Sequence, residues 1–127
     1  MFKQKISSGL KFRSIGNGKC VLSGRGHCKD AVIIVPNEYG YETIVAVDAN
    51  AFINDQTLIG IILPASVVTI GAFAFFNCLN MEVFSAISVE RVDSEAFHNC
   101  KKLLSFASGT LTQIGTGAFY GTTITSY

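Results

Sequence analysis

Cysteine and histidine are the residues of this chain best suited to catalysis or metal binding, and the sequence has four cysteines and two histidines. Cys20, His27 and Cys28 lie close together, but their spacing matches no common structural zinc site, and a fourth ligand would have to come from elsewhere. Cys20 and Cys28 could form a disulfide if the protein is exported, and would otherwise be core residues. This cluster predicts no metal site.

No nucleophile in the sequence is matched to a general base. His98 occupies a variable position after a repeated phenylalanine, which favours a surface or edge location over a catalytic one. The carboxylates are scattered over variable positions, and no pair is spaced for acid–base work. The triplets at 16–18 and 24–26 are too short to cradle a phosphate and are typical of turns. We therefore predict that the protein is not an enzyme and has no cofactor.

Cys78 and Cys100 occupy equivalent positions of an internal repeat, and we interpret them as two buried, reduced thiols. The repeat is marked by the dipeptide Ala-Phe, which recurs at intervals of 23, 22 and 22 residues. An aliphatic residue lies four positions before each dipeptide, and Asn or Gly lies two positions after each phenylalanine. The expected structural core of the repeat includes Phe52, Phe75, Phe97, Phe119, Cys78 and Cys100.

A unit of about 22 residues cannot enclose a hydrophobic core alone, whereas stacked units place like residues above like residues and share one core. The sequence therefore predicts a solenoid that is mainly β with short helical turns. Two short strands per coil are expected from the β-branched segments and from the pattern at 58–63. The Ala-Phe segments should form a turn or helical turn with the phenylalanine inward. A left-handed backbone should follow at Asn54, Asn77, Asn99 and Gly121.

Two consecutive units, VVTIGAFAFFNCLNMEVF (67–84) and VERVDSEAFHNCKKLLSF (89–106), resemble the BspA-like leucine-rich repeats of bacterial surface antigens. The segment GAFYGTTITSY (117–127) looks like the shortened repeat of that family, and 18–47 looks like the segment that often precedes its repeats. The resemblance covers roughly residues 10–127. It implies a leucine-rich-repeat solenoid, a cell-surface role, protein binding and cell adhesion.

We expect one structural domain overall. Residues 1–43 are predicted to form an N-terminal β-hairpin cap and first strand, because a solenoid end exposes unpaired strand edges. Residues 44–127 are predicted to form leucine-rich repeats at 44–66, 67–88, 89–110 and 111–127. The last repeat stops at Tyr127, inside a strand and without a polar capping unit. An excised fragment, a partner that covers the edge and a coil that tolerates exposure remain open as explanations.

The charge distribution separates the two parts of the chain. Residues 1–40 have a formal charge of +5 and residues 41–127 have −4. The basic part has no interleaved aromatic cluster, so we predict no nucleic-acid binding.

Residues 56–81 carry no charge and could span a bilayer by length, but they contain Pro64 and follow the repeat, so we predict no membrane span. The start of the chain lacks a secretory signal, so an intracellular full-length protein and a piece of an exported parent remain open.

The variable positions of the repeat carry the main functional signal. A solvated strand should be polar outward, yet these positions include large apolar residues, and a contiguous apolar stripe usually marks an interaction surface. The expected binding face comprises Ile59, Ile62, Glu82, Val83, Ser85, Leu104 and Ser105. We predict a protein–protein interaction or adhesion module; by the resemblance, its ligand is a host or extracellular protein. The alternative is a structural segment that self-associates through its uncapped C-terminal edge.

Overall fold

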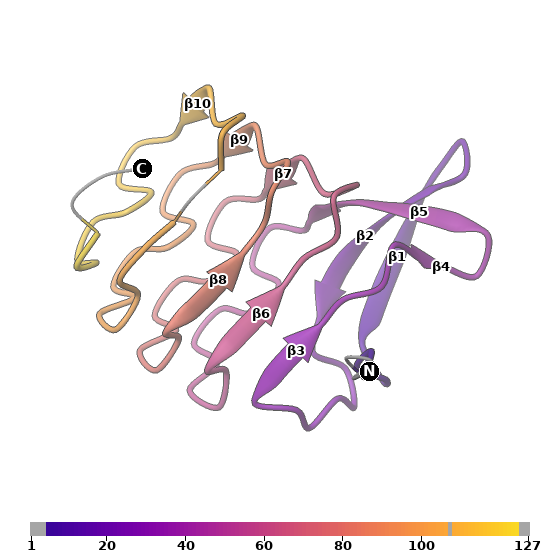
Figure 1. Ribbon diagram of the computed structural model, residues 1–127, viewed down its shortest axis with the longest axis horizontal. Helices are drawn as coiled ribbons and strands as arrows, with labels where there is room; N and C mark the ends of the chain where they lie inside the picture. The colour runs from indigo at the N-terminus through magenta and orange to yellow at the C-terminus, as the bar shows by residue number, and fades with distance from the viewer. Residues whose placement is uncertain (1–4, 107, 125–127) are drawn as a thin grey trace.

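The computed structural model describes residues 5–106 and 108–124, and these form a β-solenoid of about four coils (Figure 1). The prediction of a solenoid is confirmed. The N-terminal strands lie at one end of the long axis, and each later segment adds to the stack toward the other end. The strands are β1 (Lys11–Gly16), β2 (Lys19–Gly24), β3 (Val32–Ile34), β4 (Glu38–Tyr39), β5 (Glu42–Val47), β6 (Gly60–Ile62), β7 (Thr69–Ile70), β8 (Val83–Ser85), β9 (Arg91–Val92) and β10 (Gln113–Ile114).

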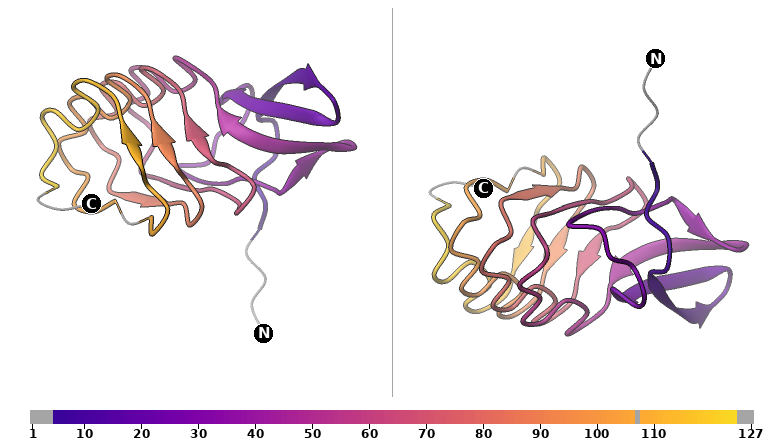
Figure 2. Two further views of the ribbon diagram at one scale, coloured as in Figure 1. Left: turned by 90° about the horizontal axis from the view of Figure 1, so that it is seen from above. Right: turned by 90° about the horizontal axis from the view of Figure 1, so that it is seen from below.

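The strands form two sheets on different sides of the coils (Figures 1 and 2). Sheet A has the order β1-β2-β5-β7-β9-β10, with β4 also paired to β5, and sheet B has the order β3-β6-β8. Pairing from coil to coil is parallel and in register, so that Val47, Ile70, Val92 and Ile114 form one row. The repeat spacing thus becomes a spatial column, because equivalent residues of successive units are hydrogen-bonded neighbours.

Four phenylalanines stack through the centre of the solenoid. The ring centroids of Phe52, Phe75, Phe97 and Phe119 follow one another at 5.4, 5.2 and 5.4 Å, with nearly parallel planes. Phe75 and Phe97 are completely buried. The spacing suits offset stacking, which adds to the free energy gained by burying the rings. This column joins every pair of neighbouring coils.

The Ala-Phe segments are hydrogen-bonded turns, and the expectation of short helical turns is corrected, because no helix occurs in the described ranges. In each coil a left-handed residue ends this turn. Asn54, Asn77 and Asn99 have φ of 60°, 59° and 66°, as expected, and Gly121 has φ 80°. The side-chain amide of Asn77 donates to Asn54 Oδ1 at 3.1 Å, and that of Asn99 donates to Asn77 Oδ1 at 3.0 Å. The turns are therefore tied together by side chains as well as by backbone.

A second left-handed column was not predicted from the sequence, although its first and last members are Asn50 and Gly117, with φ of 63° and 68°. Its middle members are Phe73 and Glu95, both with φ 60°, and such a backbone is rare for a bulky residue. The stacking explains it, because the amide of Phe73 donates to Ser94 O at 3.1 Å and that of Glu95 donates to Thr116 O at 3.1 Å. Hydrogen bonds between coils thus override the local preference of the residue.

The N-terminal segment covers one end of the stack. Strands β1 and β2 form an antiparallel hairpin, and β2 continues into the coils by parallel pairing with β5. Phe12 of the hairpin stacks on Tyr39 with centroids 4.5 Å apart. Ser7 borders the edge of sheet B, where its amide donates to Ile34 O at 2.9 Å. In the described part of the chain, no helix has the length and hydropathy needed to cross a bilayer.

Two adjacent leucines test the register of the coils. Leu103 is completely buried and Leu104 is 71% exposed. We expect Leu103→Ala to lower the free energy of unfolding by about 2–5 kcal/mol, because it leaves a cavity in a shared core. Leu104→Ala, the matched control, should change it by less than about 0.5 kcal/mol. Urea denaturation followed by circular dichroism measures both, and equal losses would show that the register is wrong.

Candidate functional site

The outer face of sheet B is apolar and partly exposed. Successive side chains along each strand point alternately inward and outward. Ile33, Ile61 and Phe84 point into the core and are buried. The residues on either side of them point outward. We call these six outward residues the sheet B face: Val32, Gly60 and Val83 in one row, and Ile34, Ile62 and Ser85 in the next. None of the six is charged.

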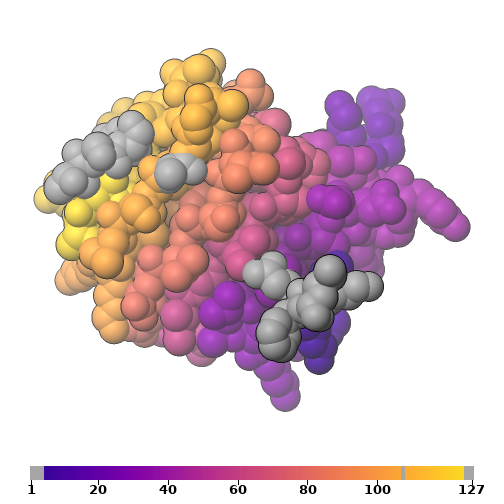
Figure 3. All heavy atoms as spheres, viewed as in Figure 1, coloured from indigo at the N-terminus to yellow at the C-terminus, as the bar shows by residue number. Residues whose placement is uncertain are grey.

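The structure brings most of the expected binding residues to this side of the molecule. Val83 is 50% exposed, while Ile62 and Ser85 are half-buried. Around the face, Ile59 and Leu104 are exposed large apolar residues, and Glu82 and Ser105 are exposed polar ones. Figure 3 shows this side of the solenoid, which contains β3, β6 and β8.

Two members of the sheet B face, Val32 and Ile34, were missed in the sequence because they precede the recognisable repeats. Val32 is 45% exposed, and β3 pairs with β6 in register, with Val32 beside Gly60 and Ile34 beside Ile62. The signal was present, since the segment VIIV at 32–35 has the apolar pattern of GIIL at 60–63. Alignment of these two segments would have extended the face by one strand.

Sheet A presents the opposite chemistry on its outer side. An open trough of about 220 Å³ lies on its surface and is lined by Val68, Thr69, Glu90, Arg91, Thr112 and Gln113. Arg91 forms an ion pair with Asp93 at 3.0 Å beside it. A polar, solvated outer side is what a half-buried sheet normally has. The apolar sheet B face is therefore the unusual one of the two.

Among the described residues, the structure gathers no group of cysteine, histidine and carboxylate side chains that could hold a metal ion. All four cysteines are buried free thiols. The thiol of Cys78 donates to Phe52 O at 3.1 Å, and that of Cys100 donates to Phe75 O at 3.0 Å. Burial raises the pKa of Cys78 far above its usual range and raises the pKa of Cys100 to about 12. These thiols stay protonated, so they serve as hydrogen-bond donors rather than nucleophiles.

His98 lies in a row of rings along the edge of the turns. Its imidazole stacks on Phe76 with centroids 4.8 Å apart and lies 5.1 Å from the ring of Tyr120. Its Nδ1 contacts a carboxylate oxygen of Glu95. The side chain is 26% exposed, in agreement with an edge position. The arrangement holds the imidazole between two rings, with its Nδ1 against a carboxylate.

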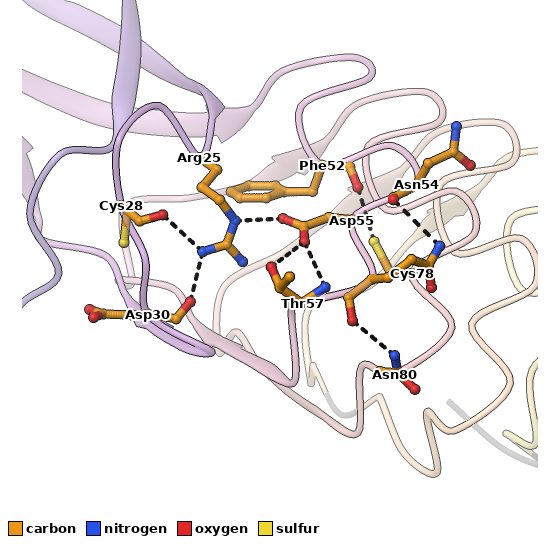
Figure 4. Close-up of polar contacts among 10 residues, drawn as sticks. Arg25, Cys28, Asp30, Phe52, Asn54, Asp55, Thr57, Cys78 and Asn80 are labelled. Atoms are coloured by element: carbon orange, nitrogen blue, oxygen red, sulfur yellow. Dashed lines mark hydrogen bonds and ion pairs between the residues drawn. The ribbon is translucent and has the colours of Figure 1, made fainter.

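A partly buried ion pair joins the N-terminal segment to the first coil (Figure 4). Asp55 occupies the position that holds cysteine in the next two coils. Its carboxylate accepts a hydrogen bond from Arg25 Nε at 2.7 Å and from the hydroxyl and amide of Thr57. Arg25 Nη1 also donates to the carbonyls of Cys28 and Asp30, at 3.1 and 2.7 Å. One side chain thus ties the loop after β2 to the repeat, and no signal in the sequence pointed to this pair.

The C-terminal coil exposes apolar residues that correspond to buried ones in the coils before it. Ile114 is 46% exposed, whereas Val92 and Ile70 in the same row are completely buried. A hollow of about 320 Å³ on this side is lined by Ile114, Gly115, Gly117, Ala118, Phe119, Tyr120 and Ile124. Tyr127, where the predicted last strand stops, lies outside the described residues.

Comparison with known proteins identifies the repeat. The family model described as the BspA type leucine rich repeat region (6 copies) matches residues 34–127. No curated protein matches the chain at a significant level.

Solved structures share the fold. A leucine-rich repeat protein from Bacteroides capillosus has a TM-score of 0.83 and 16% identity, with 96% of each chain covered. One from Bacteroides ovatus has a TM-score of 0.82 and 24% identity, and the match covers 96% of this chain and 34% of that one. The T. pallidum leucine rich repeat protein has a TM-score of 0.74 and 19% identity, over 93% of this chain and 67% of that one. At these identities the likeness concerns the fold alone.

The Arg25–Asp55 pair predicts a dependence of stability on pH. Burial would raise the pKa of Asp55, but hydrogen bonds from Arg25 and Thr57 outweigh burial and lower it. The carboxylate therefore stabilises the folded state above the unfolded pKa of about 4, and this contribution disappears as the pH falls through the lower folded value. We expect Asp55→Asn to lower the free energy of unfolding by about 2 kcal/mol at pH 7, because a partly buried guanidinium loses its charged hydrogen-bond acceptor while it keeps the carbonyls of Cys28 and Asp30. Near pH 2 we expect a much smaller cost.

Urea denaturation at both pH values measures these costs. Asp93→Asn is the matched control, because its ion pair with Arg91 is more exposed, with 34% and 52% of the side chains accessible. We expect that control to cost less than about 1 kcal/mol. A cost of Asp55→Asn that stays constant from pH 7 to pH 2 would contradict the assignment.

Proposed function

The chain belongs to the BspA-type leucine-rich-repeat family, and from this premise we propose that it is a non-enzymatic protein-binding or adhesion module that uses the sheet B face. The observation that carries the proposal is a row of outward residues without charge, in which Val32 and Val83 are about half exposed. Contiguous exposed apolar surface of this kind marks interaction sites in soluble proteins.

The chemistry of the face favours a polypeptide partner. Val32, Ile62 and Val83 offer apolar contacts, while Glu82, Ser85 and Ser105 can supply hydrogen bonds around them. An apolar centre with a polar rim is the usual organisation of a protein–protein interface. The coils beneath are held by stacked rings and inter-coil hydrogen bonds, so the face is preorganised and little ordering is needed on binding. The cell-surface location of the partner is supported by the family resemblance.

The geometry favours binding over catalysis. Repeat proteins of this type are generally non-enzymatic. Cys78 and Cys100 are buried donors, and His98 is stacked between two rings. We also propose that residues 1–43 form a cap and that residues 44–127 form four repeats after it.

A structural or self-associating segment is the second candidate. It is supported by the exposed apolar residues of the C-terminal coil, where Ile114 and Tyr120 are 46% and 70% exposed. A further coil stacked there would cover Ile114, as the earlier coils bury its equivalents Ile70 and Val92. Association through this edge would be insensitive to substitutions on the sheet B face, and Ile114→Lys would abolish it.

Selection from a displayed random-peptide library tests the proposed function. Peptides selected on the wild-type protein should lose at least about tenfold in affinity for the Ile62→Glu, Val83→Lys double variant, since each tenfold step is about 1.4 kcal/mol. The matched control is the Thr69→Glu, Gln113→Lys double variant, which places the same charges on the outer side of sheet A. Circular dichroism should show that all three proteins are folded.

The control variant should bind the selected peptides as the wild type does. If the peptides bind both double variants as well as they bind the wild type, the sheet B face is not the binding surface. If the library yields no peptide that the wild type binds, the face is not a general polypeptide site.

A further inference from the structure

We propose that Asn17 is a site of spontaneous deamidation, at which the tip of the N-terminal hairpin acquires an aspartate or an isoaspartate. The inference does not depend on the proposed function. It rests on two observations. Asn17 is the one asparagine of the sequence that precedes a glycine. Its side chain and the amide that follows it also lack the hydrogen bonds that hold the asparagines of the coils.

The reaction needs only the groups of this turn and water. The amide nitrogen of Gly18 attacks Cγ of Asn17 and closes a cyclic succinimide, and Nδ2 leaves as ammonia with the proton of that amide. Water then opens the ring at either of its carbonyl carbons. Opening at Cγ gives aspartate, and opening at the backbone carbonyl gives isoaspartate. A following glycine favours the attack, because no side chain shields the nitrogen.

The turn itself explains why this dipeptide occurs here. Asn17 and Gly18 lie between β1 and β2, with φ of 56° and 73°. Two positive φ values are typical of a type I′ hairpin turn, for which Asn-Gly is a preferred pair. Both residues are exposed, so water reaches them. The residues that form the most favourable turn are therefore also the most reactive pair.

The tip of the hairpin is free to open. Within residues 5–106 and 108–124, no group makes a hydrogen bond to the side chain of Asn17 or to the amide of Gly18. A Cβ placed on Gly16 or Gly18 would have no atom within 4 Å, so the tip is not packed against the solenoid. Ring closure requires the peptide between Asn17 and Gly18 to leave its left-handed turn, and an unpacked tip opens at little cost in free energy.

Asn99 shows the opposite situation in a similar backbone. Its φ is 66°, but its side-chain amide donates to Asn77 Oδ1 at 3.0 Å. The amide that would have to attack belongs to Cys100 and donates to Phe97 O at 3.1 Å. Both reacting groups are therefore engaged, and they lie in a turn that is stacked between coils. Asn99 is the internal control for Asn17.

The modification would act on the contact between the hairpin and the first coil. The carbonyl of Gly18 accepts a hydrogen bond from the amide of Thr43 at 2.8 Å, and the pairing of β2 with β5 begins at Lys19 beside Thr43. Isoaspartate adds a methylene to the main chain directly before this acceptor, whereas aspartate keeps the length of the chain. Isoaspartate should therefore weaken this hydrogen bond, and aspartate should preserve it.

Urea denaturation tests that consequence. The isoaspartate form can be separated from aged protein by ion exchange, and Asn17→Asp supplies the same charge without the added methylene. We expect the isoaspartate form to unfold at a lower urea concentration than Asn17→Asp. Equal midpoints would contradict a weakened contact between Gly18 and Thr43.

Incubation of the folded protein, followed by trypsin digestion and mass spectrometry, tests the site. Trypsin places Asn17 in peptide 14–19 and Asn99 in peptide 92–101. We expect conversion at Asn17 to be at least about tenfold faster than at Asn99, which is about 1.4 kcal/mol in activation free energy. The rate should rise at alkaline pH, because hydroxide removes the amide proton of Gly18. Enzymatic methylation of isoaspartate identifies that product.

The variant Asn17→Gly is the matched control, because Gly-Gly forms the same turn and has no side-chain amide. It should keep the circular dichroism of the wild type and show no conversion in peptide 14–19. A synthetic peptide of residues 14–19 gives the rate without the fold, and we expect the folded protein to react within about tenfold of it. A folded protein in which Asn17 stays intact while the free peptide is converted would overturn the proposal, as would conversion no faster than at Asn99.

Discussion

Stacking of equivalent residues in register is the constraint on which the whole structure depends. No coil has an interior of its own, so Phe75 is buried only because Phe52 and Phe97 lie above and below it. The same condition applies to the backbone, where the amide of Phe75 donates to Ala96 O and that of Asn77 donates to His98 O. A residue in this fold is therefore selected for its fit to the residues 22 positions away, more than for its fit to its neighbours in sequence.

This constraint explains why the fold was predictable from the sequence. The recurrence of Ala-Phe and of Asn at fixed spacing indicates columns, and columns at this period indicate a solenoid. It also explains why the left-handed backbone of Phe73 was not predicted. Local propensity assigns no such backbone to phenylalanine, whereas the inter-coil hydrogen bond to Ser94 imposes one. The ion pair of Arg25 and Asp55 was missed for a related reason. It joins two residues outside the repeating columns, and no period brings them together.

The candidate site was only partly predictable. Alternation along 58–63 was sufficient to place Ile62 outward, and the exposed fraction of Val83 agrees with an outward position. The extent of the face depended on β3, which lies before the recognisable repeats and joins sheet B through tertiary pairing. The contrast with sheet A also required the structure. The outer surface of sheet A has a polar trough around Glu90 and Arg91. Comparison of the two outer surfaces therefore shows that the apolar one belongs to sheet B.

The attachment of the N-terminal segment has a consequence for how such chains change in evolution. Arg25 contacts the first coil and its own loop, so the segment recognises one coil and is indifferent to how many follow. Duplication or loss of a whole unit further along would leave this contact and the hairpin undisturbed. Asp55, which pairs with Arg25, would mark the coil that comes first. The number of coils can therefore change in evolution by whole units, and the area of the surface changes with it. The coil that contacts the N-terminal segment stays the same.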